Sequence, residues 1–254
     1  MLPIPAIDIQ SGKCVRLQKG DLSSTKIYFE KPIDAAAHWI KEGTKRLHLV
    51  DLDGAKSGKP ENLEYVLEIK PNWIINAGAY TAVDKAESEK DLAFNVNALA
   101  PKYLAEISME FGIKLLHIST DFVFDGSQNF PYKTNQKRSP ISVYGYTKSC
   151  GEEFIENIMK DSNDGFIVRT SWLMGPVGKN FARTILKLVS ERDQIKVVSD
   201  QIGCPTTTLS LSTYCWDVIN IINKGKILPQ ILHYTNSGIA SWYDIAVAIK
   251  EIGL

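Results

Sequence analysis

A tyrosine and a lysine four residues apart, Tyr144 and Lys148, form the pair in this chain best suited to acid–base chemistry. Side chains with this spacing share one face of a helix, so the lysine ammonium can lie beside the tyrosine hydroxyl. A nearby cation lowers the pKa of a phenol and lets it exchange a proton near neutral pH. The pair therefore suits protonation of a carbonyl oxygen during reduction by hydride. The pattern alone is weak, because most of its occurrences are solvent-facing helix residues.

Two hydroxyl side chains, Ser119 and Thr120, end an apolar run upstream of this pair and are followed by Asp121. Open α/β sheets bind their ligands at the carboxyl ends of strands. Either hydroxyl could donate a hydrogen bond to the carbonyl oxygen that Tyr144 protonates. The competing interpretations are that Thr120 caps a loop and that Asp121 is a turn residue.

Apolar runs alternate with helical patterns almost from end to end, which is typical of βα units and a parallel sheet. We therefore predict the α/β class with a mostly parallel sheet. Asn62 is expected to cap the helix that follows it. The strands are expected at residues 4–9, 14–18, 46–50, 73–76, 114–119, 166–169 and near 196–198. The helices are expected at residues 32–43, 63–70, 144–159, 209–223 and 242–252, and within 88–111 and 177–191.

Composition argues against several classes of protein. The net charge of the 254-residue chain is zero, so no nucleic-acid or membrane partner is expected. The four cysteines are scattered, without the paired spacing of a metal site, and read as reduced thiols of a cytosolic protein. The first residues lack the pattern of a signal peptide, and no apolar run is long enough to span a bilayer. We expect a cytoplasmic protein.

Residues 71–254 resemble the dTDP-4-dehydrorhamnose reductases, a family of extended short-chain dehydrogenases/reductases. The resemblance depends on several long motifs, among them His117-Ile-Ser-Thr-Asp-Phe-Val-Phe-Asp-Gly126 and Val143-Tyr-Gly-Tyr-Thr-Lys148. It implies a Rossmann core with a small, partial substrate-binding part. The remaining matches are residues 75–87, 169–172, 178–181, 200–206 and 241–243.

The resemblance also implies roles for individual residues. Tyr144 would protonate the C4 carbonyl oxygen of a dTDP-sugar, and Lys148 would hold the nicotinamide ribose of NADPH or NADH. Thr120 would hydrogen-bond the reacting carbonyl, with Asp121 beside it on the sugar. The residues implied for the cofactor are Ala79, Tyr80 and Thr81, and those for the substrate are Trp172 and the segment 200–206. The competing interpretations are an ordinary turn at 79–81 and a core position for Trp172.

Residues 1–70 instead resemble the start of a histidine-biosynthesis isomerase family, which acts on phosphoribosylformimino-5-aminoimidazole carboxamide ribotide and folds as a (βα)8 barrel. The matches are residues 4–8, 12–17, 20–21, 46–56 and 58–62. In that family the aspartate that matches Asp8 is a catalytic acid/base. A barrel needs eight strands to close, and this segment supplies about two βα units. We therefore interpret the chain as chimeric, with a borrowed βαβα segment docked on the reductase sheet and without isomerase activity.

The same comparison raises a difficulty for cofactor binding. The reductases resembled here begin with a glycine-rich loop that lets backbone amides and a helix N-terminus approach the cofactor pyrophosphate. In this chain the loop after the first expected strand is formed by residues 10–16, which are poor in glycine, and we expect it to be solvated. The β-α-β-α order of residues 1–70 suggests the hypothesis that they fill the missing places in the doubly wound sheet. Asp51 or Asp53 could then accept a ribose hydroxyl.

The leading interpretation is an oxidoreductase that reduces the C4 ketone of dTDP-4-dehydro-rhamnose with NADPH or NADH, giving dTDP-rhamnose. Its activity is expected to be impaired by poor cofactor affinity. The alternatives are the isomerase and a non-catalytic protein that binds a nucleotide sugar. A homodimer is left open, and no metal site is expected.

Overall fold

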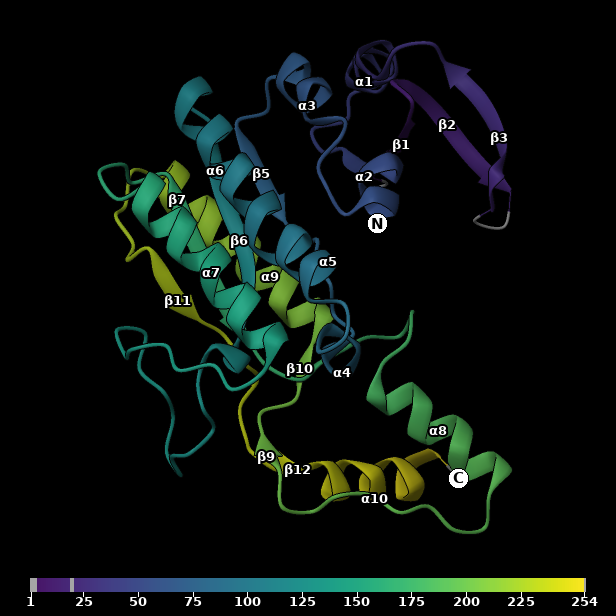
Figure 1. Ribbon diagram of the computed structural model, residues 1–254, viewed down its shortest axis with the longest axis vertical. Helices are drawn as coiled ribbons and strands as arrows, with labels where there is room; N and C mark the ends of the chain where they lie inside the picture. The colour runs from purple at the N-terminus through teal and green to yellow at the C-terminus, as the bar shows by residue number, and fades with distance from the viewer. Residues whose placement is uncertain (1–3, 19–20, 254) are drawn as a thin grey trace. The chain divides into compact units, whose positions relative to one another are not determined.

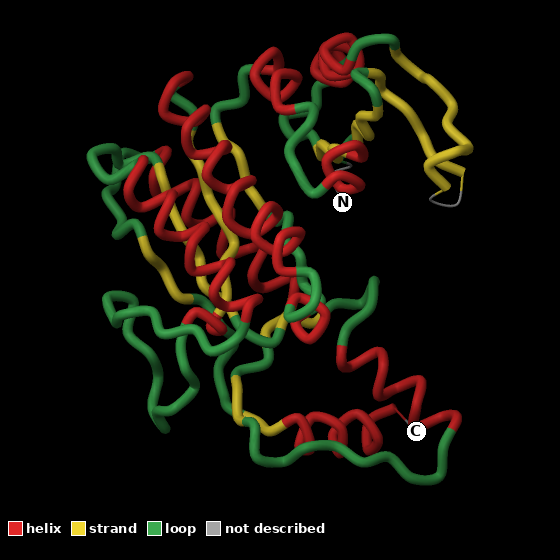
Figure 2. The backbone as a smooth tube through the Cα atoms, viewed as in Figure 1, coloured by secondary structure: helices red, strands yellow, loops and turns green. Residues whose placement is uncertain are grey.

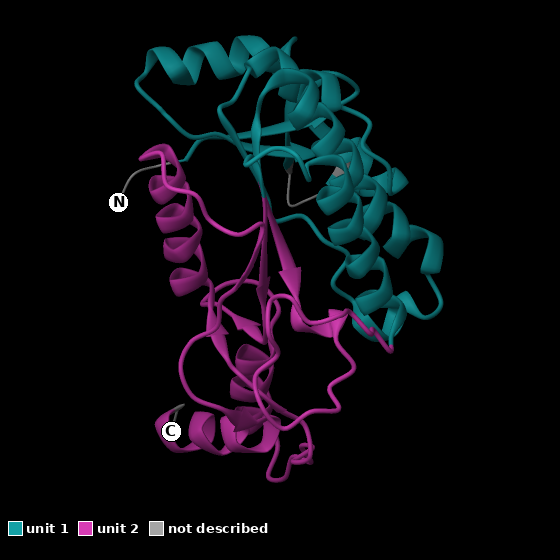
Figure 3. Cartoon of the chain, turned by 90° about the vertical axis from the view of Figure 1, so that its left-hand side faces the viewer, with its two compact units in different colours: residues 1–115, 142–165 teal, residues 116–141, 166–254 magenta. Residues whose placement is uncertain are grey.

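The computed structural model describes residues 4–18 and 21–253, and helices alternate in it with short strands (Figures 1 and 2). The predicted α/β class is thereby confirmed. Contacts divide the chain into unit 1, residues 1–115 and 142–165, and unit 2, residues 116–141 and 166–254 (Figure 3). This division follows contacts and not ancestry, so the expected segments 1–70 and 71–254 stay a prediction. Among the described helices, none has both the length and the apolar character needed to cross a bilayer.

Unit 1 begins with a four-stranded sheet in the order β3-β2-β1-β4. Strands β1 and β2 are antiparallel and are joined by Ser11 and Gly12, both of which have positive φ, at 50° and 74°. Two such residues in succession match the twist of a tight hairpin. Strand β1 also pairs with β4 in parallel. The bounds are β1 Ala6–Gln10, β2 Lys13–Gln18, β3 Asp21–Phe29 and β4 His48–Asp51.

Three helices accompany this sheet: α1 (Pro32–Lys41), α2 (Leu52–Ser57) and α3 (Leu63–Ile69). Helix α1 starts with proline, whose fixed φ suits the first helical position. Its Ala35 and Ala36 pack in one apolar cluster with Ile7 and Ile9 of β1. The N-terminal segment therefore has a small core of its own.

Two expectations about this segment are wrong. Strands β1 and β4 belong to a different sheet from the later strands, so residues 1–70 do not fill vacant places in the doubly wound sheet. The physical reason is the hairpin, because β2 occupies one edge of β1 where a βαβ unit would lead into a helix. Asn62 precedes α3 but its side chain does not cap that helix. It donates instead to the carboxylates of Asp51 and Asp53, at 2.6 and 2.9 Å.

The rest of unit 1 surrounds one long helix, α7 (Val143–Ile158), against which α4, α5, η1 and α6 pack (Figure 1). The helix expected within residues 88–111 is interrupted by a π-helical segment, η1 (Asn95–Leu99). Gly151 of α7 lies close to η1, since a Cβ there would collide with the backbone carbonyl of Asn97. The other bounds are β5 Trp73–Asn76, α4 Val83–Ala86, α5 Lys90–Phe94 and α6 Ala100–Phe111.

A second four-stranded sheet has the order β11-β7-β6-β5. Strand β7 (Gly165–Thr170) is buried along its whole length, as expected of a central strand in a sheet covered on both faces. It pairs in parallel with β11 (Ile231–His233). Strand β6 (Lys114–Thr120) carries the residues at which the division between the units falls.

The remaining elements belong to unit 2. Strands β8 and β10 pair in parallel, and β9 and β12 pair in the antiparallel sense. The strand expected near residues 196–198 is not formed. The bounds are η2 Asp121–Val123, β8 Leu173–Met174, α8 Phe181–Glu191, β9 Ile202–Gly203, β10 Thr206–Thr207, α9 Thr208–Asn223, β12 Ala240–Ser241 and α10 Trp242–Gly253.

Candidate active site

The first turn of α7 is fixed by two hydrogen bonds to its backbone. The hydroxyl of Ser142 accepts from the N–H of Gly145 at 3.1 Å, which caps the helix. The carboxylate of Glu87 accepts from the N–H of Val143 at 2.8 Å. Tyr144 lies in this turn and is half-buried. Its position in the helix is therefore well determined, as a proton donor requires.

Lys148 lies one helical turn after Tyr144 and only 1% of the residue is exposed. Burial lowers its pKa to about 8, because an ammonium ion loses hydration inside the protein, and the charge of Glu152 opposes that fall. A fully buried lysine is unusual and is not the solvent-facing residue of the competing interpretation.

Asn97, on η1, links α7 to the loop that follows β5. Its side-chain oxygen accepts from the N–H of Tyr80 at 2.9 Å. Its side-chain nitrogen donates to the carbonyl of Tyr80 at 3.1 Å and to the hydroxyl of Thr147 at 3.2 Å. Thr147 in turn donates to the carbonyl of Tyr144 at 2.9 Å. The structure thus brings the predicted loop Ala79–Thr81 to the predicted helix.

Sequence reasoning missed Asn97, although one signal could have found it. An asparagine within an otherwise apolar helical pattern is unfavourable unless its amide is used. Asn97 is fully buried and makes three hydrogen bonds, two of them to backbone groups of Tyr80.

We expect the substitution Asn97→Ala to destabilise the protein by about 2–4 kcal/mol. It removes the hydrogen-bond partner of the backbone N–H and carbonyl of Tyr80, and it leaves a small void. Urea unfolding followed by circular dichroism measures the change. Asn95→Ala is the matched control, since Asn95 lies on the same π-helical segment and is only half-buried. Equal losses for the two variants would contradict the structural role of Asn97.

Tyr80 itself is not a candidate acid. Its hydroxyl donates to the carboxylate of Glu89 at 2.7 Å, and that bond is the main cause that raises the pKa of Tyr80 to about 12. Glu89 also pairs with Lys85 at 2.6 Å. These contacts hold the side chain of Tyr80 away from proton transfer, while its backbone N–H and carbonyl are bonded to Asn97.

Unit 2 carries the other predicted reaction residues, Thr120 and Asp121. The hydroxyl of Thr120 accepts from the N–H of Phe122 at 3.2 Å and so caps the short helix η2. It also donates to the carboxylate of Asp121 at 3.1 Å. Thr120 thus forms the cap that the competing interpretation expects, and its hydroxyl oxygen lies at the carboxyl end of β6. Burial raises the pKa of Asp121 to about 6, and the Thr120 bond partly opposes this.

The shifted pKa of Asp121 makes stability depend on pH. Because the pKa is raised from 3.8 on folding, the folded state binds more protons than the unfolded state between about pH 4 and 6. The contribution of Asp121 to the free energy of unfolding therefore falls as pH rises through this window. We expect Asp121→Asn to stabilise the protein by about 1–3 kcal/mol at pH 7 and to have little effect at pH 4. Urea unfolding at both values measures this, and an equal effect at the two would contradict it.

Trp172, also in unit 2, has a backbone in the left-handed region, with φ of 44°. Its indole stacks on that of Trp242, with ring centroids 3.6 Å apart. A side chain at Gly203 would collide with the Trp172 ring, so this position must stay small. A non-glycine residue with this φ is strained and persists only where its surroundings hold it. Trp172 is therefore placed by specific packing and is not simply a residue of the central core.

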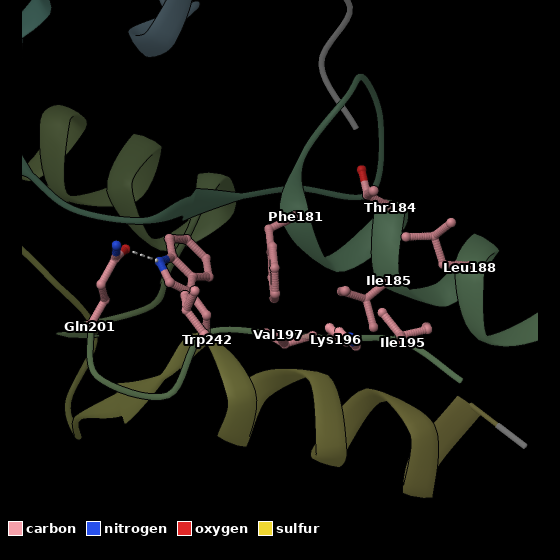
Figure 4. Close-up of a pocket in the computed structure, with 10 residues that line it drawn as sticks. Phe181, Thr184, Ile185, Leu188, Ile195, Lys196, Val197, Gln201 and Trp242 are labelled. Atoms are coloured by element: carbon pink, nitrogen blue, oxygen red, sulfur yellow. Dashed lines mark hydrogen bonds between the residues drawn. The ribbon is translucent and has the colours of Figure 1, made fainter. Parts of the chain in front are cut away.

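Trp242 also lines a cavity of about 350 Å³ in unit 2 (Figure 4). Helix α8 contributes Phe181, whose ring lies 4.4 Å from Trp242 between centroids. Gln201 accepts a hydrogen bond from the indole N–H of Trp242 at 3.2 Å. The cavity is apolar along one side and has a polar end at Gln201. It could hold a flat ring. The remaining lining residues are Thr184, Ile185, Leu188 and residues 195–198.

The segment 200–206 contributes to unit 2 in three ways. Gln201 lines the cavity, and Thr206 pairs with Leu173 in a short parallel bridge. The carbonyl of Cys204 accepts from the hydroxyl of Ser171 at 2.7 Å. These contacts connect the segment to the turn that carries Trp172.

The acidic residues of the N-terminal segment have structural partners. Asp51 accepts from the backbone N–H groups of Gly54, Glu61 and Asn62, at 2.8 to 3.1 Å. Asp53 accepts from the N–H of Ser11 at 2.6 Å. Asp8 lies within β1, which pairs with β2 and β4. The stretches that resemble the isomerase family contain no match for the second catalytic aspartate of that family. Asp51 and Asp53 hold loops in place, and a ribose contact by either of them stays a prediction.

A family model described as the RmlD substrate binding domain matches residues 42–252, a stretch that begins upstream of Pro71. Among curated proteins, the chain is 42% identical over 182 residues to the spore coat polysaccharide biosynthesis protein SpsK of Bacillus subtilis, covering 72% of this chain and 61% of that protein. It is 36% identical over 205 residues to the dTDP-4-dehydrorhamnose reductase of Escherichia coli, covering 81% and 68%.

Solved structures give a consistent result. A crystal structure of dTDP-4-dehydrorhamnose reductase from Bacillus anthracis in complex with NADP has a TM-score of 0.73 and 37% identity, covering 81% of this chain and 71% of that one. An orthologue from Clostridium acetobutylicum has a TM-score of 0.73 and 36% identity, covering 85% and 76%. The Rossmann-like fold predicted from the sequence is thereby confirmed. The chain spans only 61% of the length of the first curated relatives that it matches.

Proposed function

This chain belongs to the family of the RmlD substrate binding domain, and on that basis we propose that it is an NADPH- or NADH-dependent reductase of a dTDP-sugar. The substrate we propose is dTDP-4-dehydro-rhamnose, whose C4 ketone becomes the hydroxyl of dTDP-rhamnose. The observation that carries the proposal is the buried lysine, Lys148, one turn from Tyr144 at the capped start of α7. The names of the relatives support the same activity.

The nicotinamide cofactor supplies hydride to the carbonyl carbon when it is bound. Tyr144 gives its proton to the carbonyl oxygen as negative charge develops there, which completes the hydroxyl, and the phenolate is then reprotonated from solvent. The Lys148 ammonium would stabilise that phenolate and would hold the ribose of the cofactor. The loop Ala79–Thr81, held to α7 by Asn97, would line the same cofactor.

The residues of this chain fit the ribose side of the cofactor better than its pyrophosphate side. A buried ammonium and a clamped loop are present in unit 1 for the ribose. A pyrophosphate site needs a helix N-terminus, whereas the turn after β1, at Ser11 and Gly12, leads into an antiparallel strand of a separate sheet.

We assign the substrate contacts to unit 2. Thr120 would exchange its bond to Asp121 for one to the reacting carbonyl, and Asp121 would accept from a sugar hydroxyl. Trp172 would border the sugar, and the cavity beside Trp242 would take the flat pyrimidine of the nucleotide. The aromatic side chains of Phe181 and Trp242 that line the cavity support this assignment.

Oxidation of NADPH by the full chain in the presence of dTDP-4-dehydro-rhamnose tests the activity, and NMR of the product identifies the new hydroxyl. A substrate-dependent fall in NADPH absorbance with formation of dTDP-rhamnose would support the proposal. A chain that binds both dTDP-rhamnose and NADPH but never oxidises the NADPH would contradict it.

That second outcome would favour the rival function, a nucleotide-sugar-binding protein without turnover. One observation favours this rival, namely that the turn after β1 leads into an antiparallel strand and not into a helix N-terminus that could bind pyrophosphate. We place the protein in the cytoplasm. The homodimer stays a prediction, which light scattering on the purified chain tests.

A further inference from the structure

Glu152 is a carboxylate buried on the same face of α7 as the reaction pair. It follows Lys148 by four residues, as Lys148 follows Tyr144, so the three side chains form one row along the helix. Glu152 is 0% exposed. Glutamate is almost never fully buried unless it is paired, because its charge loses hydration without compensation. Its burial next to a buried lysine therefore calls for a specific interaction.

The described helices that pack on α7 bring no buried charge to it. Segment η1 has no ionisable residue. On the helices, Lys85 pairs with Glu89 and Lys102 with Glu106, at 2.6 and 3.6 Å. The charge of Glu152 acts on Lys148 and favours its ammonium form. The ionisable side chains of these helices are all exposed or half-buried: Asp84, Lys85, Lys90, Asp91, Lys102, Tyr103, Glu106 and Glu110.

We propose that Glu152 is a positioning residue that holds Lys148 as an ammonium ion beside Tyr144. The proposal deepens the function proposed above and rests on it for the roles of Tyr144 and Lys148. Glu152 touches neither substrate nor cofactor in this scheme. It acts through Lys148, by supplying the negative charge that a buried cation needs.

The physical reason is a competition between two effects on Lys148. Burial lowers the pKa of Lys148, and Glu152 raises it, with the result at about 8. At pH 7 the balance leaves the side chain mostly charged. Without the carboxylate, burial alone would act, and the balance would shift toward neutral Lys148. Tyr144 would then lose the cation that makes its proton transferable.

The test is the titration of Lys148 in the full chain, followed by NMR of lysines labelled with carbon-13 at Cε. The signal is assigned by its loss in Lys148→Arg. We expect Glu152→Gln to lower the midpoint of Lys148 by at least about one pH unit, the effect of removing a close opposite charge. Glu153→Gln is the matched control, since Glu153 lies on the same helix and is exposed. An unchanged midpoint in Glu152→Gln would overturn the proposal.

A second measurement uses the unaltered chain, so it stands even if Glu152→Gln fails to fold. The side-chain carboxyl carbon of Glu152 should show a step in chemical shift at the midpoint of Lys148, because the two charges interact. Its absence would overturn the proposal. Neither NMR measurement needs substrate, so both distinguish failure of this inference from failure of the proposed function. If the chain turns over substrate, Glu152→Gln should lower kcat more at pH 8 than at pH 6 and leave the KM for the sugar unchanged.

Discussion

Replacing Tyr144 by phenylalanine should lower kcat for reduction of the dTDP-4-keto sugar by about 10²–10⁴-fold, the usual contribution of a positioned acid. The change removes one oxygen and keeps the ring, so the first turn of α7, capped by Ser142, should remain folded. KM should change little, because the hydroxyl acts mainly on the charge that develops in the transition state. Steady-state oxidation of NADPH at saturating sugar measures both constants.

The chain offers a matched control for this substitution. Tyr146 lies two residues further along α7, on another face, and is 56% exposed. Tyr146→Phe removes the same atom from the same helix and should leave kcat within about twofold, as expected of a surface change. Equal losses in the two variants, or full activity in Tyr144→Phe, would contradict the role given to Tyr144.

The second large effect concerns cofactor affinity, which should be weaker than micromolar by several powers of ten. Charge-assisted hydrogen bonds from a helix N-terminus to a phosphate contribute about 1.5–3 kcal/mol each. Lack of three such bonds amounts to about 4–9 kcal/mol, or about three to six powers of ten in Kd. The hairpin at Ser11 and Gly12, where β1 meets an antiparallel strand, supplies no helix N-terminus of this kind.

A comparison of two ligands makes this prediction specific. Reduced nicotinamide mononucleotide carries the nicotinamide ribose but lacks the pyrophosphate and the adenosine. If Lys148 and the loop Ala79–Thr81 hold only the ribose side, NADPH and the mononucleotide should bind with Kd values within about tenfold of each other. Fluorescence titration of both with the full chain measures this. A micromolar Kd for NADPH, or a preference for it of several hundredfold, would show that some part of the chain holds the pyrophosphate.

The sequence predicted the reaction helix well because two independent signals agree. The Tyr-x-x-x-Lys spacing and the strand-end hydroxyl of Thr120 each follow from local rules, and the structure places Lys148 in the interior as the pair requires. The role of Asn97 did not follow, because a clamp between a π-helical segment and a distant loop depends on tertiary contacts that no local pattern records.

The N-terminal segment shows the opposite case, in which a correct reading of strands led to a wrong arrangement. Residues 6–10 and 48–51 are strands that pair in parallel, as the βα pattern indicates. The prediction that these strands join the doubly wound sheet is wrong. It took Ser11 and Gly12, which both have positive φ, for a solvated loop and not for a hairpin turn. The side chain of Asn62 likewise had two possible partners, a helix end and a carboxylate. In the structure it donates to the nearby carboxylates of Asp51 and Asp53.

The face-to-face indoles of Trp172 and Trp242 give this protein an optical signal of its own. Two indoles this close couple their electronic transitions and should produce a paired positive and negative band in the ultraviolet circular dichroism spectrum. Trp242 also forms a wall of the unit 2 cavity, so a molecule entering there would alter the coupling. Occupancy of that cavity can therefore be followed in solution without dye, label or turnover.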